Sequence, residues 1–150
     1  MNRQFKTVPD TNILLASTSK NPESPNREYF ERWLRRAEFD LLYSDDTLAE
    51  YALKLKSEKF GLPEEKIEEL LTCIVMLGLH VDIEHFHLPV YPEDPDDVSF
   101  LLCAENGDAS HLISYDHHIL DLQYRHELDF KICELIDFLK ELRASQATDR

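Results

Sequence analysis

Glycine is scarce in this chain of 150 residues, where it occupies only 3 positions. Loops that cradle phosphates, of the GxxxxGK[ST] or GxGxxG kind, need several glycines close together, and neither motif is present. The sequence therefore argues against a nucleotide cofactor. Serine and cysteine also lack a recognisable nucleophile elbow, which argues against a hydrolase that works through a covalent intermediate.

Cysteine and long apolar runs are also sparse. The 3 cysteines, Cys73, Cys103 and Cys133, have no CxxC spacing and lie in apolar segments, so we expect buried, reduced thiols rather than zinc ligands. The chain shows no basic region followed by an apolar stretch at its start, and no later stretch is apolar for the length that spans a bilayer. We therefore expect a cytoplasmic protein that is neither secreted nor inserted in a membrane.

Basic residues are the third shortage, because 16 Lys and Arg stand against 30 Asp and Glu, which gives a formal net charge of −14. An acidic surface repels the phosphate backbone of nucleic acids. Three explanations stay open. Divalent cations neutralise a cluster of the acids, a basic partner covers part of the surface, or nucleic acid is not the ligand.

The length and the 43% apolar content are sufficient for one domain that buries a core without disulfide or metal staples. We expect this domain to span residues 1–143 and a flexible tail to follow at 144–150. The sequence shows no internal repeats and no low-complexity tract. The whole chain therefore serves a single fold.

Short apolar strands alternate with helices along the chain. Strands are predicted at 5–9, 40–44, within 80–90, at 111–115 and at 130–134. Helices are predicted at 46–60, 63–79, 98–107 and 135–143, and around an apolar stripe of Phe30, Trp33, Leu34 and Ala37. This alternation predicts an α/β fold, in which a mostly parallel sheet of four to five strands has helices on both faces.

Acidic residues follow four successive predicted strands. Asp10 follows the first, Glu50 lies about two turns into the helix after the second, Asp96 and Asp97 follow the third, and Asp116 ends the fourth. Because the carboxyl ends of parallel strands share one edge of a sheet, these acids are expected to converge. Converging carboxylates repel unless a divalent cation lies between them, and oxygen ligands suit Mg²⁺ or Mn²⁺. That chemistry points to the hydrolysis of phosphodiesters.

Each acid also has an ordinary structural explanation. Asp10, Asp96 and Asp97 fit helix caps, Glu50 fits a surface helix position, and Asp116 fits a turn. For any one acid alone, this explanation is the more common one. The occurrence of acids after every one of four strands is what favours a metal site.

Histidines form two further groups. His85 and His87 alternate along one face of the predicted third strand, which is compatible with a transition-metal site but lacks a clear third ligand. His117 and His118 stand beside Asp116 and are within reach of a phosphate, although a solvated loop is the more common role of such residues.

Three segments resemble the PIN-domain ribonuclease family, and specifically its branch of toxins from toxin–antitoxin pairs. VPDTNILLAS resembles the opening strand and Asp-Thr-Asn signature of that family, and YSDDTLAEYALKL resembles the helix that carries its second acid. DPDDVSFLLCAENGDASHLISYDHHIL resembles its long closing motif and is the most specific match. The resemblance extends from about Lys6 to the final helix.

The resemblance implies a three-layer α/β/α fold and a Mg²⁺- or Mn²⁺-dependent endoribonuclease that uses no covalent intermediate. It also implies an RNA substrate, an antitoxin partner and a homodimer. The basic segments 27–36 and 54–59 would then contact RNA phosphates or pair with surface acids. Carried over residue by residue, the implied catalytic and metal-binding acids are Asp10, Glu50, Asp97 and Asp116, the supporting residues are Asn12, Ser44 and Ser114, and Asp96 competes with Asp97.

The sequence departs from the family pattern at two places. Val98 stands where the family branch often has a third acid, and Ser114 and Tyr115 stand where it often has Thr-Gly. A bulky Tyr115 beside the site would narrow substrate access, so the alternative is a catalytically silent PIN-like module that binds or regulates. A phospho-accepting receiver domain is a third hypothesis, but Lys131 lies within the last strand rather than after it, which disfavours it.

Overall fold

The protein folds around one five-stranded sheet. The computed structural model describes residues 5–15, 23–57 and 61–148. All neighbouring strands are parallel, in the order β3-β2-β1-β4-β5, which confirms the predicted fold class. The strands are β1 Lys6–Pro9, β2 Asp40–Tyr43, β3 Leu79–His80, β4 His111–Ile113 and β5 Lys131–Cys133.

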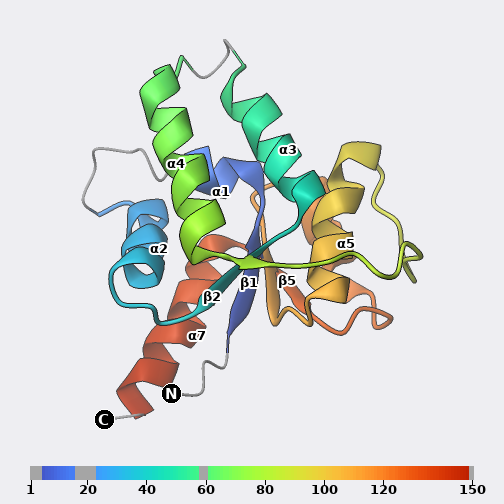
Figure 1. Cartoon of the computed structure of the whole chain (residues 1–150). Coiled ribbons are helices and arrows are strands. Elements are labelled where there is room, and N and C mark those ends of the chain that lie inside the picture. Colours follow the sequence, from blue (N-terminus) through green and yellow to red (C-terminus); the bar gives the residue numbers. More distant parts are fainter. Residues whose placement is uncertain (1–4, 16–22, 58–60, 149–150) are drawn as a thin grey trace.

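Helices cover both faces of this sheet, as Figure 1 shows. α3, α4 and α5 pack side by side on one face, while α7 packs against β4 and α2 on the other. None of the helices in the described ranges is long and apolar enough to span a membrane. The α-helices are α1 Thr11–Leu15, α2 Pro25–Leu34, α3 Asp45–Leu55, α4 Glu64–Leu77, α5 Val98–Asn106, α6 His117–Leu120 and α7 Leu135–Thr148, with 3-10 turns η3 Pro95–Asp97 and η4 Asp121–Tyr124.

The sheet has a topological switch point between β1 and β4. The chain builds β2 and β3 on one side of β1 and then crosses to build β4 and β5 on the other. The two strands end level with each other, because Pro9 pairs with Ile113 and the N–H of Asp10 donates to the Ile113 carbonyl over 2.8 Å. In open α/β sheets ligands bind at such a point, outside the carboxyl ends of the strands.

The predicted apolar stripes are buried in part. In α4, Ile67, Leu70 and Ile74 are buried as expected for an amphipathic helix. The stripe in α2 is shorter than predicted, because Leu34 is 39% exposed and Ala37 lies beyond the helix end with a positive φ of 50°. The helix ends at Leu34, so the last predicted turn does not face the core.

The predicted strand at 80–90 is wrong except at its first residue, since only Leu79–His80 pairs with β2. Beyond Val81 the chain follows an irregular path to η3, and the backbone N–H groups of Glu84 and His85 both donate to the Asn106 side chain over 2.9 Å. A side-chain amide therefore satisfies backbone groups that a strand partner would otherwise bind. Asp97 reaches its position at the end of this irregular segment rather than directly after a strand.

Two helix boundaries also differ from prediction. α3 begins at Asp45 rather than at residue 46, because Ser44 is its N-cap and the Ser44 hydroxyl accepts from the Thr47 N–H over 3.2 Å. α3 ends at Leu55, and residues 58–60 of the predicted helix lie outside the described ranges.

The last helix is longer than predicted. α7 continues to Thr148, so the proposed boundary at residue 143 falls inside a helix rather than before a tail. The segment 144–148 contains no glycine or proline to end the helix, and Arg143 is held to α2 by Glu28. Residues 149–150 lie outside the described ranges.

Candidate functional site

Asp10 lies at the carboxyl end of β1 and is only 3% exposed. Its Oδ1 accepts from the Thr11 N–H over 2.7 Å, and its Oδ2 accepts from the Ser114 hydroxyl over 2.8 Å. Burial raises the pKa of Asp10 above its ordinary value, although both hydrogen bonds act in the opposite direction. The carboxylate is thus held in one orientation inside the protein.

Ser114 connects Asp10 with Asp116. It is fully buried directly after β4, and while its hydroxyl donates to Asp10 it accepts from the Asp116 N–H over 2.9 Å. Asp116 in turn caps α6, because its Oδ1 accepts from the His118 N–H over 2.9 Å. One hydroxyl therefore sets the spacing between two acids that follow neighbouring strands.

Asp97 is the buried member of the Asp96–Asp97 pair. It is 2% exposed, whereas Asp96 is exposed and its N–H donates to Asp94 Oδ1 over 2.9 Å. Burial, followed by the charges of Asp10, Asp94 and Asp116, raises the pKa of Asp97 to about 6. Within the described part of the chain, Asp97 Oδ2 is buried and accepts no hydrogen bond.

Glu50 projects from the second turn of α3, the helix that Ser44 caps. Its Oε2 is buried without a hydrogen bond among the described residues, and the nearest cation in an ion pair is Lys54 Nζ at 3.8 Å. Burial raises the pKa of Glu50, Lys54 lowers it, and the charges of Asp96, Asp94 and Asp10 raise it further. Glu50 is thus electrostatically coupled to Asp10.

The structure brings the four predicted acids together. Asp10 interacts with the charge of Asp116, Asp97 with those of Asp10 and Asp116, and Glu50 with that of Asp10. Of the predicted supporting residues, Ser114 contacts an acid directly, whereas Ser44 acts through the cap of α3. The third supporting residue, Asn12, is exposed in α1.

This arrangement suits a divalent cation. Buried carboxylate oxygens that lack donors carry a desolvation cost, which a cation would offset. The donor set is made of oxygens from Asp10, Glu50, Asp97 and Asp116, the ligands that Mg²⁺ and Mn²⁺ take. Asp97 Oδ2 and Glu50 Oε2 are the two oxygens that a cation would satisfy.

Sequence reasoning missed Asp94, and it placed Lys54 only in the basic segment 54–59 rather than beside the acids. The charge of Lys54 lowers the pKa of Asp10, Glu50 and Asp97, so the ammonium belongs to the electrostatics of the site. Its signal was the spacing of four residues after Glu50, which puts both side chains on one face of α3. Asp94 is the N-cap of η3, and its charge raises the pKa of both Glu50 and Asp97.

Tyr115 is held by α2. Its hydroxyl donates to Asn26 Oδ1 over 2.9 Å, and the Asn26 side chain donates in turn to the Ile13 carbonyl over 3.0 Å. The bulky ring is therefore fixed toward α2, although it remains 42% exposed. Val98, the other departure from the family pattern, is half-buried at the start of α5.

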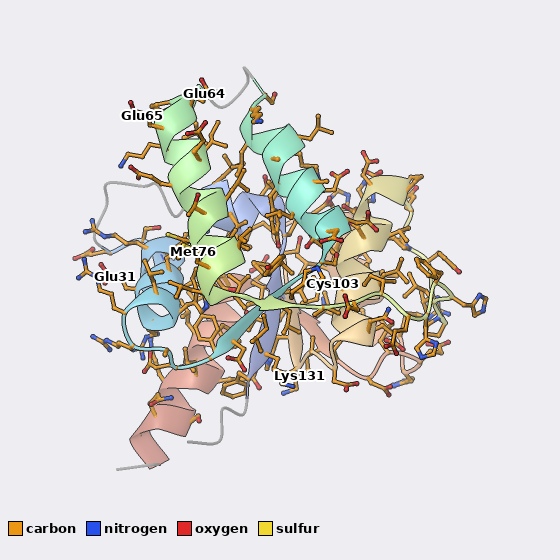
Figure 2. All side chains as sticks on the ribbon, in the orientation of Figure 1. Glu31, Glu64, Glu65, Met76, Cys103 and Lys131 are labelled. Carbon is orange, nitrogen blue, oxygen red and sulfur yellow. The ribbon has the colours of Figure 1, made fainter. Side chains whose placement is uncertain are left out.

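Two other predicted groups lie apart from the four acids. His85 and His87 are exposed in the irregular segment before η3, so the two-histidine strand face does not form. Among the described residues the three cysteines are free, and burial raises the pKa of Cys103, labelled in Figure 2, and of Cys133 to about 12. These thiols are not poised as nucleophiles.

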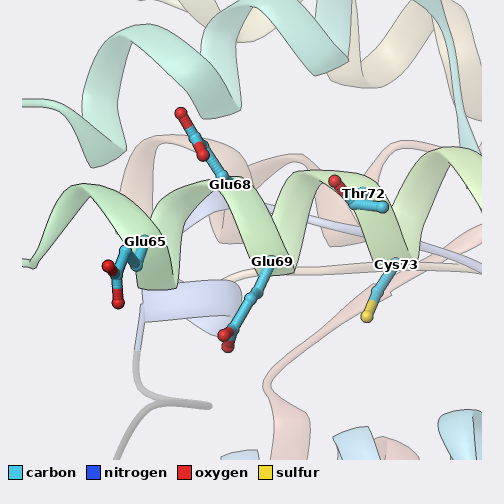
Figure 3. Close-up of a pocket in the computed structure, with 5 residues that line it drawn as sticks. All are labelled: Glu65, Glu68, Glu69, Thr72 and Cys73. Carbon is cyan, nitrogen blue, oxygen red and sulfur yellow. The ribbon is translucent and has the colours of Figure 1, made fainter.

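A hollow lies along α4 (Figure 3). It is lined by Glu65, Glu68, Glu69, Thr72 and Cys73, all from one helix. Its three glutamates oppose the binding of a phosphate, and none of the four predicted site acids lines it. The candidate site therefore does not coincide with this hollow.

A family model described as PIN domain matches residues 6–118 of the chain. No curated protein sequence matches the chain. Among solved structures, PAE2754 from Pyrobaculum aerophilum is similar, with a TM-score of 0.61 and 16% identity over 93% of this chain and 90% of that one.

Two complexes contain similar chains. VapBC2 from Rickettsia felis, bound to a DNA fragment from their promoter, gives a TM-score of 0.54 and 16% identity over 85% of this chain and 98% of that one. FitAcB from Neisseria gonorrhoeae gives a TM-score of 0.52 and 15% identity over 87% of this chain and 98% of that one. At these identities the likeness supports the fold, which agrees with the predicted three-layer architecture.

Proposed function

Because the chain belongs to the PIN-domain family, we propose that it is a Mg²⁺- or Mn²⁺-dependent endoribonuclease that hydrolyses RNA phosphodiesters by attack of water. The observation that carries this proposal is the meeting of four acids from four separate segments with two buried oxygens lacking donors. Those oxygens belong to Asp97 and Glu50. A purely structural cap would have satisfied its carboxylate with backbone N–H groups, as Asp116 does in part.

The different burial of the four acids suggests different roles for them. Asp10 and Asp97, the most buried pair, would hold the cation, and Ser114 keeps Asp10 oriented for this task. Asp116 and Glu50 lie at the more exposed edge and would complete the ligand set and orient the attacking water. When bound, the cation activates that water and offsets the charge that develops on the phosphate.

Lys54 would contact the RNA. Its side chain is 36% exposed, and its ammonium lies at the rim of the acid cluster and above the Phe100 ring at 5.8 Å from the ring centroid. A divalent cation at the four acids and Lys54 together supply three positive charges against four carboxylates, which neutralises most of the local negative charge. A chain with a net charge of −14 can then accept a phosphate backbone at this one place.

We infer in addition that the chain works as a toxin with an antitoxin partner, as the resemblance implies. The structural likeness to VapBC2, solved bound to a DNA fragment from their promoter, and to FitAcB supports this inference. The end of α4 offers a surface for such a partner, because Val75, Met76 and Leu77 are 48%, 76% and 58% exposed. Glutamates earlier on the same helix favour a partner with basic residues beside its apolar ones. The inferred homodimer is to be tested by measuring the mass of the free protein.

The alternative is a PIN-like module that binds or regulates but does not cut. Tyr115 and Val98 favour it, because both replace residues that the family branch often carries at the site. This alternative predicts an intact fold without hydrolysis. Cleavage assays therefore decide between the two functions.

The deciding experiment is cleavage of a mixed RNA substrate by purified protein with Mg²⁺, with Mn²⁺ and with EDTA. The variants are Asp10→Asn and Asp116→Asn, and the matched control is Asp137→Asn, which removes the same charge at an exposed position of α7. Cleavage that needs the metal, is lost in both site variants and persists in the control supports the nuclease. Equal background in every sample refutes it and favours the silent module.

A further inference from the structure

Asp116, His117 and His118 form a cluster of three potential metal ligands. One ligand atom from each residue lies within 4.8 Å of the other two. The two imidazole rings face each other at a tilt of 37°, with 4.2 Å between their centroids. Two nitrogens and a carboxylate oxygen are therefore available from three consecutive residues.

A second observation points independently to a ligand at His118. Glu93 Oε2 lies 2.9 Å from His118 Nδ1, so the carboxylate pairs with that nitrogen. With Nδ1 paired, Nε2 is the ring nitrogen that remains for a metal ion. Histidines that bind metals usually donate their other ring N–H to a carboxylate or a carbonyl in this way, which orients the ring and strengthens the ligand.

The chemistry of the three donors differs from that of the four acids. A set of all-oxygen ligands suits Mg²⁺ and Mn²⁺, whereas imidazole nitrogen suits Zn²⁺, Co²⁺ and Ni²⁺. Three protein ligands with an open position are a common arrangement for zinc at reactive centres. His117 is exposed and His118 half-buried, so an ion from solvent reaches the cluster.

We propose that Asp116, His117 and His118 form a second, nitrogen-containing site for a transition-metal ion, with Glu93 as the residue that positions His118. The site shares Asp116 with the four acids, and only this sharing depends on the proposed nuclease centre. Loss of Asp116 therefore weakens both sites. Loss of Asp10 weakens only the four-acid centre, and loss of the two histidines weakens only the second site.

The test uses Co²⁺, whose visible absorption reports nitrogen ligation, together with Zn²⁺ titration followed by calorimetry. The proteins are the unmodified chain, Asp10→Asn, Glu93→Gln and the double variant His117→Gln with His118→Gln. The control is His85→Gln with His87→Gln, which removes two exposed histidines outside the cluster. Circular dichroism of each variant shows that it is folded.

The proposal expects a Co²⁺ absorption band and a Zn²⁺ binding event in the unmodified protein, in Asp10→Asn and in the control. Both signals disappear in the double histidine variant, and Zn²⁺ affinity falls about ten-fold or more in Glu93→Gln. Binding that is lost in Asp10→Asn but not in the histidine variant overturns the second site and leaves the four-acid centre standing. Absence of nitrogen-type Co²⁺ absorption in the unmodified protein also overturns it, whatever the result of the RNA assay.

Discussion

Asp10 and Ser114, 104 positions apart in the sequence, are joined by a 2.8 Å hydrogen bond from the serine hydroxyl to the buried carboxylate. The same hydroxyl accepts from the Asp116 N–H over 2.9 Å, so one side chain holds two of the site acids. The pair lies at the ends of β1 and β4, where the strand order reverses. The position of the candidate site thus follows from the topology of the sheet.

Substitution Ser114→Ala is expected to lower the free energy of unfolding by about 1–3 kcal/mol, because a buried charged acceptor loses its donor. The affinity for Mn²⁺ should fall as well, since Asp10 loses its orientation. Chemical denaturation and Mn²⁺ titration measure the two effects. Ser99→Ala is the matched control, because in the described part of the chain the Ser99 hydroxyl is buried without a partner and its removal should cost little.

The Ser114→Thr variant tests whether the hydroxyl at position 114 is the cause of these effects. Threonine keeps the hydroxyl, so it should retain the Mn²⁺ affinity of the unmodified protein if the hydrogen bond is what matters. An alanine variant as stable and as tightly metal-binding as the unmodified chain would show that Ser114 does not organise the site.

Asp97→Asn is expected to stabilise the metal-free protein while abolishing its stabilisation by Mn²⁺. The folded-state pKa of Asp97, about 6, lies above its ordinary value of 3.8, so the native carboxyl holds a proton that the unfolded chain releases. The destabilisation of the folded protein by the Asp97 carboxylate therefore grows as the pH rises from about 4 to 6, and it is complete above 6. At about 1.36 kcal/mol per pKa unit, the cost relieved at pH 7 is up to roughly 3 kcal/mol.

Thermal melts at pH 4 and pH 7.5, with and without Mn²⁺, test this expectation. The gain in melting temperature should be present at pH 7.5 and largely absent at pH 4. Asp96→Asn, at the exposed neighbouring position, should change little. A metal-free Asp97→Asn protein that is less stable at pH 7.5 would contradict the assignment of Asp97 as an unsatisfied site acid.

Glu28 connects α2 to α7 through Arg143. Its Oε2 accepts from Arg143 Nε over 3.0 Å and from Arg32 Nε over 2.9 Å. The Arg143 hydrogen bond is the main cause that lowers the pKa of Glu28 below its ordinary value of 4.5. The stabilisation is therefore complete above pH 4.5 and is lost as the pH falls through the lowered folded-state pKa.

Glu28→Gln should lower the free energy of unfolding by roughly 1 kcal/mol at pH 7, a modest amount because the group is 28% exposed. The difference from the unmodified protein should vanish at acid pH, below the lowered folded-state pKa of Glu28. Urea denaturation at the two pH values measures it. Glu31→Gln, which breaks the more exposed pair with Arg27, serves as the control, and equal effects of the two variants would refute a special role for Glu28.

The sequence predicted the site acids where a local pattern marks them. Asp10 directly follows the strand β1, Asp116 lies three residues after β4 and directly before α6, and Asp97 directly precedes α5, so periodicity and caps were sufficient to predict where these acids lie. It could not predict that Ser114 bonds to two acids, because that depends on the register of β1 against β4.

The failed third strand has a similar cause. Residues 80–90 alternate in the manner of a strand. The backbone N–H groups of Glu84 and His85, however, donate to the Asn106 side chain, 22 positions beyond Glu84, instead of to a neighbouring strand. Such tertiary contacts override local propensity and leave no periodic signal. The position of Lys54 beside the acids was not predicted for a related reason, since it depends on three acids on other turns and segments.

Lys54→Met should change metal binding and RNA cleavage in opposite directions. Lys54 Nζ lies 3.8 Å from Glu50 Oε2 and its positive charge lowers the pKa of Asp10, Glu50 and Asp97, so its removal makes the acid cluster more attractive to Mn²⁺. Mn²⁺ affinity should rise a few-fold. Cleavage of RNA at low salt should fall by about ten-fold, because a phosphate contact is lost and the salt dependence becomes weaker.

Calorimetry with Mn²⁺ and initial cleavage rates at several salt concentrations measure the two effects in the same samples. Lys56→Met, which removes an exposed lysine two positions further along the chain, should leave both nearly unchanged. A lysine that only stabilises α3 through its pair with Glu50 would produce a lower melting temperature and a parallel loss of both functions. Opposite changes in metal affinity and cleavage therefore identify Lys54 as a residue that contacts the RNA.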